Sequence, residues 1–114
     1  METKPNLIVD LTFAFSLKIM AFCDVLEAKR KFNMANQLFK SGTSIGANVA
    51  EAQGAESKND FKHKCKIASK EAEETQYWLR LCKYAESYPF EEGLLEDVQS
   101  IIRVLGKIIS SSNK

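Results

Sequence analysis

Residues 41–54 read SGTSIGANVAEAQG, and small residues recur in this stretch at every fourth position, at Gly42, Gly46 and Ala50. If the stretch is helical, this spacing places all three on one side of the helix. A glycine inside a helix costs about 1 kcal/mol relative to alanine. Two glycines in one helix are expected where the absence of side chains lets the backbone of another segment come close. The stretch therefore predicts close packing of this helix against a neighbouring helix.

Apolar residues recur in steps of three and four along four segments of the chain, and strand-like alternation is absent. We expect helices over residues 6–28, 34–53, 58–87 and 91–110. Short connections between helices favour antiparallel neighbours. The sequence therefore predicts an all-α, antiparallel up-down-up-down four-helix bundle that forms one domain over residues 1–114.

Some helix boundaries carry local signals. Pro5 fits the start of the first helix, Asn33 is the expected N-cap of the second, and Ser57 and Asp60 have the spacing of a capping box at the start of the third. The third helix also carries a seven-residue repeat, the period of left-handed supercoiled packing. The repeat consists of Phe61, Cys65, Ala68, Ala72, Thr75, Leu79 and Cys82.

Two helices have more apolar surface than a small bundle needs. The third helix has a further apolar face, made by Tyr77, Trp78, Leu81 and Tyr84. The first helix has a second face, made by Leu7, Ala14, Leu17, Ala21 and Val25. Self-association is the simplest way to bury such a surplus, so we expect a homo-oligomer. The alternative is a monomer in which thick helices wrap a well-filled core.

The charges balance overall but not locally. The 16 basic and 15 acidic side chains give a net charge of +1, which is a poor match to a dedicated nucleic-acid-binding protein. In an up-down bundle, however, one end gathers nine basic and five acidic side chains. Its basic residues are Lys4, Lys58, Lys62, Lys64, Lys66, Lys70, Arg103, Lys107 and Lys114. Such an end is either a surface for a polyanion such as RNA or an ordinary solvated surface.

Signals for enzymatic chemistry are weak. The three cysteines, at positions 23, 65 and 82, form no Cys-x-x-Cys pair and fit core thiols in a reducing cytoplasm. The single histidine, His63, has only Asp60 at metal-binding spacing, which cannot build a two-metal site. Glycine-rich nucleotide-binding motifs are absent. We therefore expect no catalytic, cofactor-binding or metal-binding residues, and a metal or cofactor enzyme is the weakest hypothesis.

Two further features bear on location and contacts. Asp10, Lys18 and Asp24 interrupt the apolar run over residues 7–26, and each charge would be costly at the centre of a bilayer. We therefore expect a cytoplasmic protein without a membrane partner. Asn48 and Glu51 lie on the small-residue helix and need polar partners if they are partly buried. They either link helices within the bundle or contact a partner macromolecule.

The motif Ser44-Ile45-x-x-Asn48-Val49-Ala50-Glu51 resembles the core of the bacterial 23S rRNA intervening-sequence protein family, and the pairs Asp60-Phe61 and Ile67-Ala68 with Glu74 extend the likeness. The resemblance implies a cytoplasmic four-helix bundle that assembles as a homopentamer. It also implies a ribosomal-protein label that reflects gene position, an unknown function and no catalytic residues. A related branch, the accessory protein of diversity-generating retroelements, binds nucleic acid and a reverse transcriptase.

These observations lead to one hypothesis and one alternative. We expect a non-enzymatic, homo-oligomeric bundle that binds RNA, or an RNA-processing protein, through its basic end. The alternative is a protein-binding scaffold, without nucleic-acid contact, whose face around Trp78 and Tyr84 holds a partner.

Overall fold

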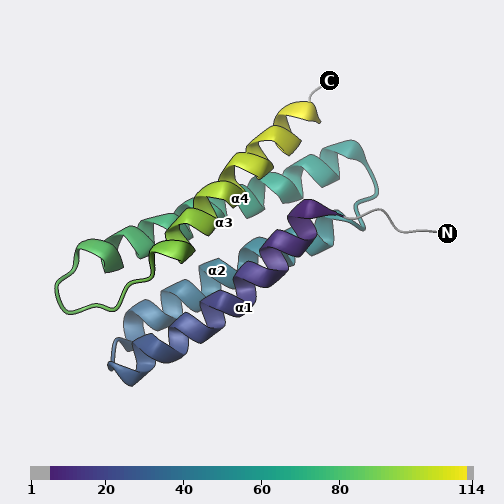
Figure 1. Ribbon diagram of the computed structural model, residues 1–114. Coiled ribbons are helices and arrows are strands. Elements are labelled where there is room, and N and C mark those ends of the chain that lie inside the picture. The colour runs from purple at the N-terminus through teal and green to yellow at the C-terminus, as the bar shows by residue number, and fades with distance from the viewer. Residues whose placement is uncertain (1–5, 113–114) are drawn as a thin grey trace.

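Four α-helices make up the computed structural model, which describes residues 6–112. The helices are α1 (Leu7–Ala28), α2 (Phe32–Ala52), α3 (Lys58–Tyr84) and α4 (Glu92–Ser111). They run alternately up and down, and the chain enters and leaves at the same end of the bundle (Figure 1). α1 packs on α2 and α4, and α3 packs on the same two helices. The predicted antiparallel four-helix bundle is confirmed.

Local hydrogen bonds explain where α1 and α3 begin. The Asn6 side chain accepts a hydrogen bond from the Val9 backbone N–H at 3.4 Å, which caps α1. Pro5 lies outside the described residues. At the start of α3, the Ser57 hydroxyl accepts a hydrogen bond from the Asp60 N–H at 3.0 Å. This contact is half of the predicted capping box, and the Asp60 carboxylate completes it by accepting from the Glu56 N–H rather than from Ser57.

Two boundaries differ from the expectation by more than one residue, the start of α2 and the end of α3. Asn33 does not cap α2, because the helix already begins at Phe32. Arg30 adopts a left-handed conformation (φ 62°), and the Lys31 N–H donates to the Leu26 carbonyl at 2.8 Å. This compact C-terminal motif ends α1, and only residues 29–31 separate it from α2.

The end of α3 also moves relative to the prediction. The helix ends at Tyr84, three residues earlier than expected, because Ala85 is extended. The chain leaves the helix so that Tyr88 and Phe90 can pack against the core. The Lys31 ammonium group lies 4.7 Å from the centre of the Tyr88 ring and holds this connection against the start of α2.

The core follows the predicted stripes closely. The seven-residue repeat of α3 is buried from Cys65 through Cys82, and its first member, Phe61, is half-buried. A buried hydrogen bond of 2.9 Å joins the hydroxyl groups of Thr75 on α3 and Ser41 on α2. Because both hydroxyls lie fully inside the protein, this bond removes the cost of burying them without a partner.

The closest packing joins α1 and α2. A Cβ atom added at Gly42 would lie 2.8 Å from Cγ2 of the buried Ile19. A Cβ atom added at Gly46 would lie 3.2 Å from the backbone carbonyl oxygen of Thr12. The structure therefore places both glycines against α1. Ala50, the third small residue of the predicted stripe, is exposed, so the close contact is seen at Gly42 and Gly46.

We expect Gly42→Ala to destabilise the protein despite the better helix propensity of alanine. The added methyl group collides with a β-branched side chain that has little rotamer freedom, and overpacking of this kind costs about 1–3 kcal/mol. The gain in helix propensity is about 1 kcal/mol, so we expect a net loss of up to about 2 kcal/mol. Urea denaturation at fixed protein concentration measures the change.

Gly106→Ala is the matched control. Gly106 also lies inside a helix, but nothing comes within 4 Å of the position of its added Cβ. The same substitution there should stabilise the protein by up to about 1 kcal/mol. Equal effects of the two substitutions would contradict the close contact at Gly42.

The three cysteines are free and buried in the core. Burial raises the pKa of Cys23 to about 11, and the nearby acidic groups of Glu27 and Asp24 add to the shift. Burial likewise raises the pKa of Cys82 to about 11. Between its ordinary pKa and its raised pKa, such a thiol is protonated in the folded protein but ionised in the unfolded chain. Its contribution to stability is therefore complete below pH 9 and is lost as the pH rises towards 11.

These pKa values predict slow alkylation of the native protein. The thiolate is the reacting form. With an ordinary pKa of 9.0, half of an unperturbed thiol is ionised at pH 9. We expect iodoacetamide to modify Cys23 and Cys82 at least roughly fiftyfold more slowly in the native protein than in urea at pH 9, because a pKa of about 11 leaves few thiolates and burial shields the thiols from the reagent. Mass spectrometry follows the reaction, and similar rates in the two states would refute the shift.

Candidate functional site

The first half of α3 runs beside the last half of α4 at one end of the bundle (Figure 1), and seven basic residues belong to these two segments. We call these residues the basic surface: Lys58, Lys62, Lys64, Lys66, Lys70, Arg103 and Lys107. Lys62 and Lys64 are half-buried, and the other five are exposed. The structure thus places two groups of basic residues, more than thirty positions apart in the sequence, at the same end of the bundle.

The four-residue spacing of the lysines shapes this surface. Four residues exceed one helical turn by about 40°, so the lysines from Lys58 to Lys70 wind slowly around α3. Lys58 lies near α4, where it lines the same pocket as Lys107. Lys66 and Lys70 are exposed further along the helix. The row therefore leads from the end of the bundle along the outside of α3.

Acidic groups do not cancel the charge of this end within residues 6–112. Among these residues, four acidic side chains lie at the end of the bundle that carries the seven basic ones. Glu51 forms a salt bridge with Lys64 at 3.2 Å, which links α2 to α3. The Asp60 carboxylate accepts a hydrogen bond from the Glu56 N–H at 3.4 Å. Glu2, Lys4 and Lys114, which the sequence assigns to the same end, lie outside the described residues.

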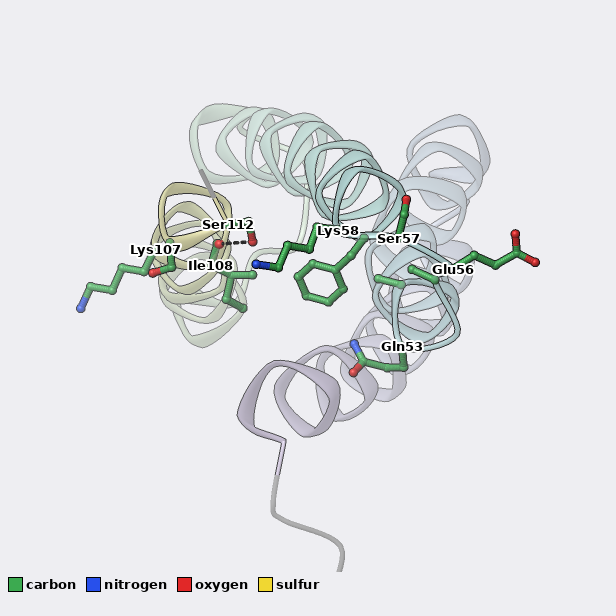
Figure 2. Close-up of a pocket in the computed structure, with 11 residues that line it drawn as sticks. Gln53, Glu56, Ser57, Lys58, Lys107, Ile108 and Ser112 are labelled. Carbon is green, nitrogen blue, oxygen red and sulfur yellow. Dashed lines mark hydrogen bonds between the residues drawn. The ribbon is translucent and has the colours of Figure 1, made fainter. Parts of the chain in front are cut away.

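A pocket of about 750 Å³ opens at this end, between the α2–α3 connection, the start of α3 and the end of α4. Phe61, Ile108, Ala52 and Ala55 supply its apolar lining. Figure 2 shows Lys58 reaching across the pocket toward Ile108 and Ser112, whereas Lys107 and Glu56 point away from it. The sequence gives no sign of this pocket, because it forms from three segments that are far apart in the chain.

A second, apolar cavity lies between α1 and α2 on the outside of the bundle. This apolar groove has a volume of about 450 Å³. Phe13 and Leu17 line it with 66 % and 54 % of their surfaces exposed, and Met20 and Phe39 are also exposed there. Leu17 belongs to the second face predicted for the first helix. The sequence did not predict the exposure of Phe13, Met20 and Phe39. The periodicity of apolar residues shows which faces of a helix are apolar, but it does not show which of these faces the neighbouring helices leave exposed.

The predicted aromatic face of α3 is largely exposed. Tyr77, Leu81 and Tyr84 are exposed, Tyr84 to 75 %. Trp78 is half-buried, and its indole N–H donates to the Glu74 carboxylate at 3.2 Å. The rings of Tyr77 and Trp78 meet edge-to-face with their centres 5.3 Å apart. We call Tyr77, Leu81 and Tyr84 the α3 patch.

The α3 patch continues into a shallow groove towards α2. This groove has a volume of about 390 Å³ and is lined by Met34, Leu81, Tyr84, Ala85 and Tyr88. The apolar groove and the α3 patch thus lie on different sides of the bundle, and α2 borders both.

Asn48 and Glu51 have different surroundings. The half-buried Asn48 amide donates to the Ser44 carbonyl at 2.9 Å, so its hydrogen bond stays within α2. Glu51 is exposed and reaches α3 through its salt bridge with Lys64. Of the two residues, only Glu51 therefore links helices through a hydrogen bond or ion pair recorded in the structure.

The described part of the chain contains no group of three or more His, Cys, Asp or Glu residues that could hold a metal ion. His63 is exposed on α3. None of the four helices is long and apolar enough to span a bilayer.

Comparisons with known proteins identify the family. Residues 4–111 match the 23S rRNA-intervening sequence protein family. The fold is similar to the crystal structure of a protein of unknown function from the S23 ribosomal protein family of Bacteroides thetaiotaomicron, with a TM-score of 0.84 and 40 % sequence identity. The similarity covers 90 % of this chain and 97 % of that one. No curated protein matches the chain. With nearly its whole length matched, this chain belongs to the 23S rRNA-intervening sequence protein family.

Proposed function

We propose that this protein is a non-enzymatic, cytoplasmic ring-forming homo-oligomer that presents its basic surface to RNA. The observation that carries the proposal is the separation of two exposed apolar surfaces, the apolar groove and the α3 patch, from the basic surface. Exposed apolar side chains gathered in one groove are typical of interaction sites. The buried cysteines fit a reducing compartment and a binding role better than thiol chemistry.

The positions of the apolar surfaces favour a ring. A twofold dimer formed through the apolar groove alone would leave the α3 patch in water. If the groove of one copy instead receives the α3 patch of the next, both surfaces are covered. This contact joins two different surfaces on adjacent sides of the bundle, so each copy is rotated relative to the last and the series can close. The family resemblance implies five copies.

The basic surface remains available in such an assembly. It occupies the first half of α3 and the facing part of α4, whereas the α3 patch occupies the last turns of α3. Copies arranged in parallel around a ring present the same basic end on one side. Their summed positive potential attracts the phosphate backbone of RNA more strongly than one nearly neutral chain can.

We expect Leu17→Gln to weaken self-association while the fold is kept, because Leu17 lines the groove and is already 54 % exposed. Leu7→Gln is the matched control: Leu7 is 61 % exposed on the same helix but does not line the groove. Light scattering of the unmodified protein should give a multiple of 12.8 kDa, and that of the Leu17 variant a smaller mass. A 12.8 kDa monomer before any substitution would refute the assembly.

We expect the combined replacement of Lys58, Lys66 and Lys70 by Gln to abolish most RNA binding at moderate salt. All three are exposed, and the removal of each ammonium group that meets a phosphate should make the slope of log affinity against log salt shallower by about 0.7–0.9. Fluorescence anisotropy with a structured RNA measures both the affinity and its salt dependence.

The control for this triple variant replaces Lys29, Arg30 and Lys40 by Gln, which removes the same charge away from the basic surface. It should keep the salt slope of the unmodified protein. Equal losses in the two triple variants would mean that only net charge matters. Unchanged affinity in the first variant would eliminate the basic surface as the RNA contact.

The protein-binding scaffold is the second candidate, and the exposure of Tyr84 is the observation that favours it. Tyr84→Lys separates the two candidates. If the ring forms as proposed, this substitution should reduce the mass in solution. If the oligomer persists unchanged, the α3 patch lies outside the contacts between copies and is open to another protein.

A further inference from the structure

We propose that the pocket at the basic end accepts one unstacked base of a single-stranded RNA, with the neighbouring phosphates on Lys58 and the lysines that follow it on α3. This inference depends on the RNA binding proposed above and names the form of RNA that the basic surface selects. It rests on the residues that line the pocket and on the row of lysines that extends from the pocket along α3.

The pocket has the size and lining that a flat apolar group needs. Its volume of about 750 Å³ falls in the range of about 300–1,000 Å³ that is typical of small-ligand sites. Phe61 on α3 and Ile108 on α4 are half-buried against the core, so they are held in place and still line the pocket. Proteins that bind single-stranded RNA commonly stack bases on such aromatic side chains.

Fixed polar groups surround the apolar lining. The Gln53 amide donates to the Val49 carbonyl at 3.0 Å and accepts from the Asn6 amide at 2.9 Å. The Ser112 hydroxyl donates to the Ile108 carbonyl at 2.9 Å. These bonds hold two edges of the pocket, and the Ser112 oxygen keeps a lone pair with which it can accept a hydrogen bond from the edge of a base.

The charges give the strand a direction. The Lys58 side chain crosses the pocket (Figure 2), and Lys62, Lys66 and Lys70 continue from it along α3 at steps of about 6 Å. Glu56 points away from the pocket, so its carboxylate does not oppose a phosphate there. A row of regularly spaced cations beside one apolar pocket suits a polyanion that carries flat bases. A base held inside a duplex cannot enter such a pocket, which is why we infer a single strand.

The test compares three fluorescent probes: a short oligouridylate, an abasic ribose-phosphate chain of equal length, and a short RNA duplex. We expect the oligouridylate to bind at least about fivefold more tightly than either of the others, since stacking of one base contributes this much or more. Phe61→Leu keeps an apolar side chain of similar size but removes the aromatic face. It should lower the affinity for oligouridylate at least about fivefold and leave the abasic chain unaffected.

Phe90→Leu is the matched control, because Phe90 is also half-buried against the core but precedes α4 at the opposite end of the bundle. It should leave the affinities for all three probes unchanged. In the unmodified protein, an oligonucleotide with 4-thiouridine should cross-link under light to peptides that contain Phe61 or Ile108. This second measurement does not depend on whether the Phe61 variant folds.

The outcomes separate this inference from the RNA function itself. Equal affinity for the oligouridylate and the abasic chain, or cross-links confined to Lys66 and Lys70, would overturn the base pocket and leave RNA binding by the lysines intact. Undetectable binding of all three probes at low salt would overturn RNA binding and the pocket together.

Discussion

The close contact between α1 and α2 is the constraint on which the other features depend. The buried side chain of Ile19 fills the space that a side chain at position 42 would need, and Gly46 lies against the backbone of Thr12. The hydroxyl of Thr12 bonds to the Ile8 carbonyl and that of Ser16 to the Thr12 carbonyl, so both meet their hydrogen-bonding needs within α1. The backbones of α1 and α2 can approach because α2 has glycines at the contact and because the polar side chains of α1 form their hydrogen bonds within their own helix.

That same contact shapes the outer surface. Small side chains line the floor of the space between α1 and α2, at Gly46, Ala47 and Ala50. Larger side chains, such as Phe13 and Phe39, form its walls. The result is the apolar groove. On the other side of α2, the Thr75–Ser41 hydrogen bond and the Lys64–Glu51 salt bridge fix α3, which carries the α3 patch and most of the basic surface. The bundle therefore has two separate apolar surfaces, which is what the proposed contact between the groove of one copy and the patch of the next requires.

Much of this could be predicted from the sequence, because the signals are local or periodic. The repeat in α3 and the Ser57 cap depend on residues within one helix or one turn, and the motif around Asn48 identified the family. Other features depend on how segments meet. The left-handed residue at Arg30 moved the start of α2, and packing of Tyr88 ended α3 early. The pocket at the basic end and the apolar groove both form between helices. Their shapes depend on how each helix is rotated about its own axis, and the periodic pattern of one helix does not specify this rotation.

A double-mutant cycle between Gly42→Ala and Ile19→Ala tests the close contact most directly, with urea denaturation of the four proteins at one concentration. Ile19→Ala removes the Cγ atoms that a Cβ atom at position 42 would meet at 2.8 and 2.9 Å. We expect Gly42→Ala to destabilise the unmodified protein but to become neutral or stabilising once Ile19 is alanine, because only its better helix propensity then remains. If the effects of the two substitutions simply add, α1 and α2 do not meet at this point as described.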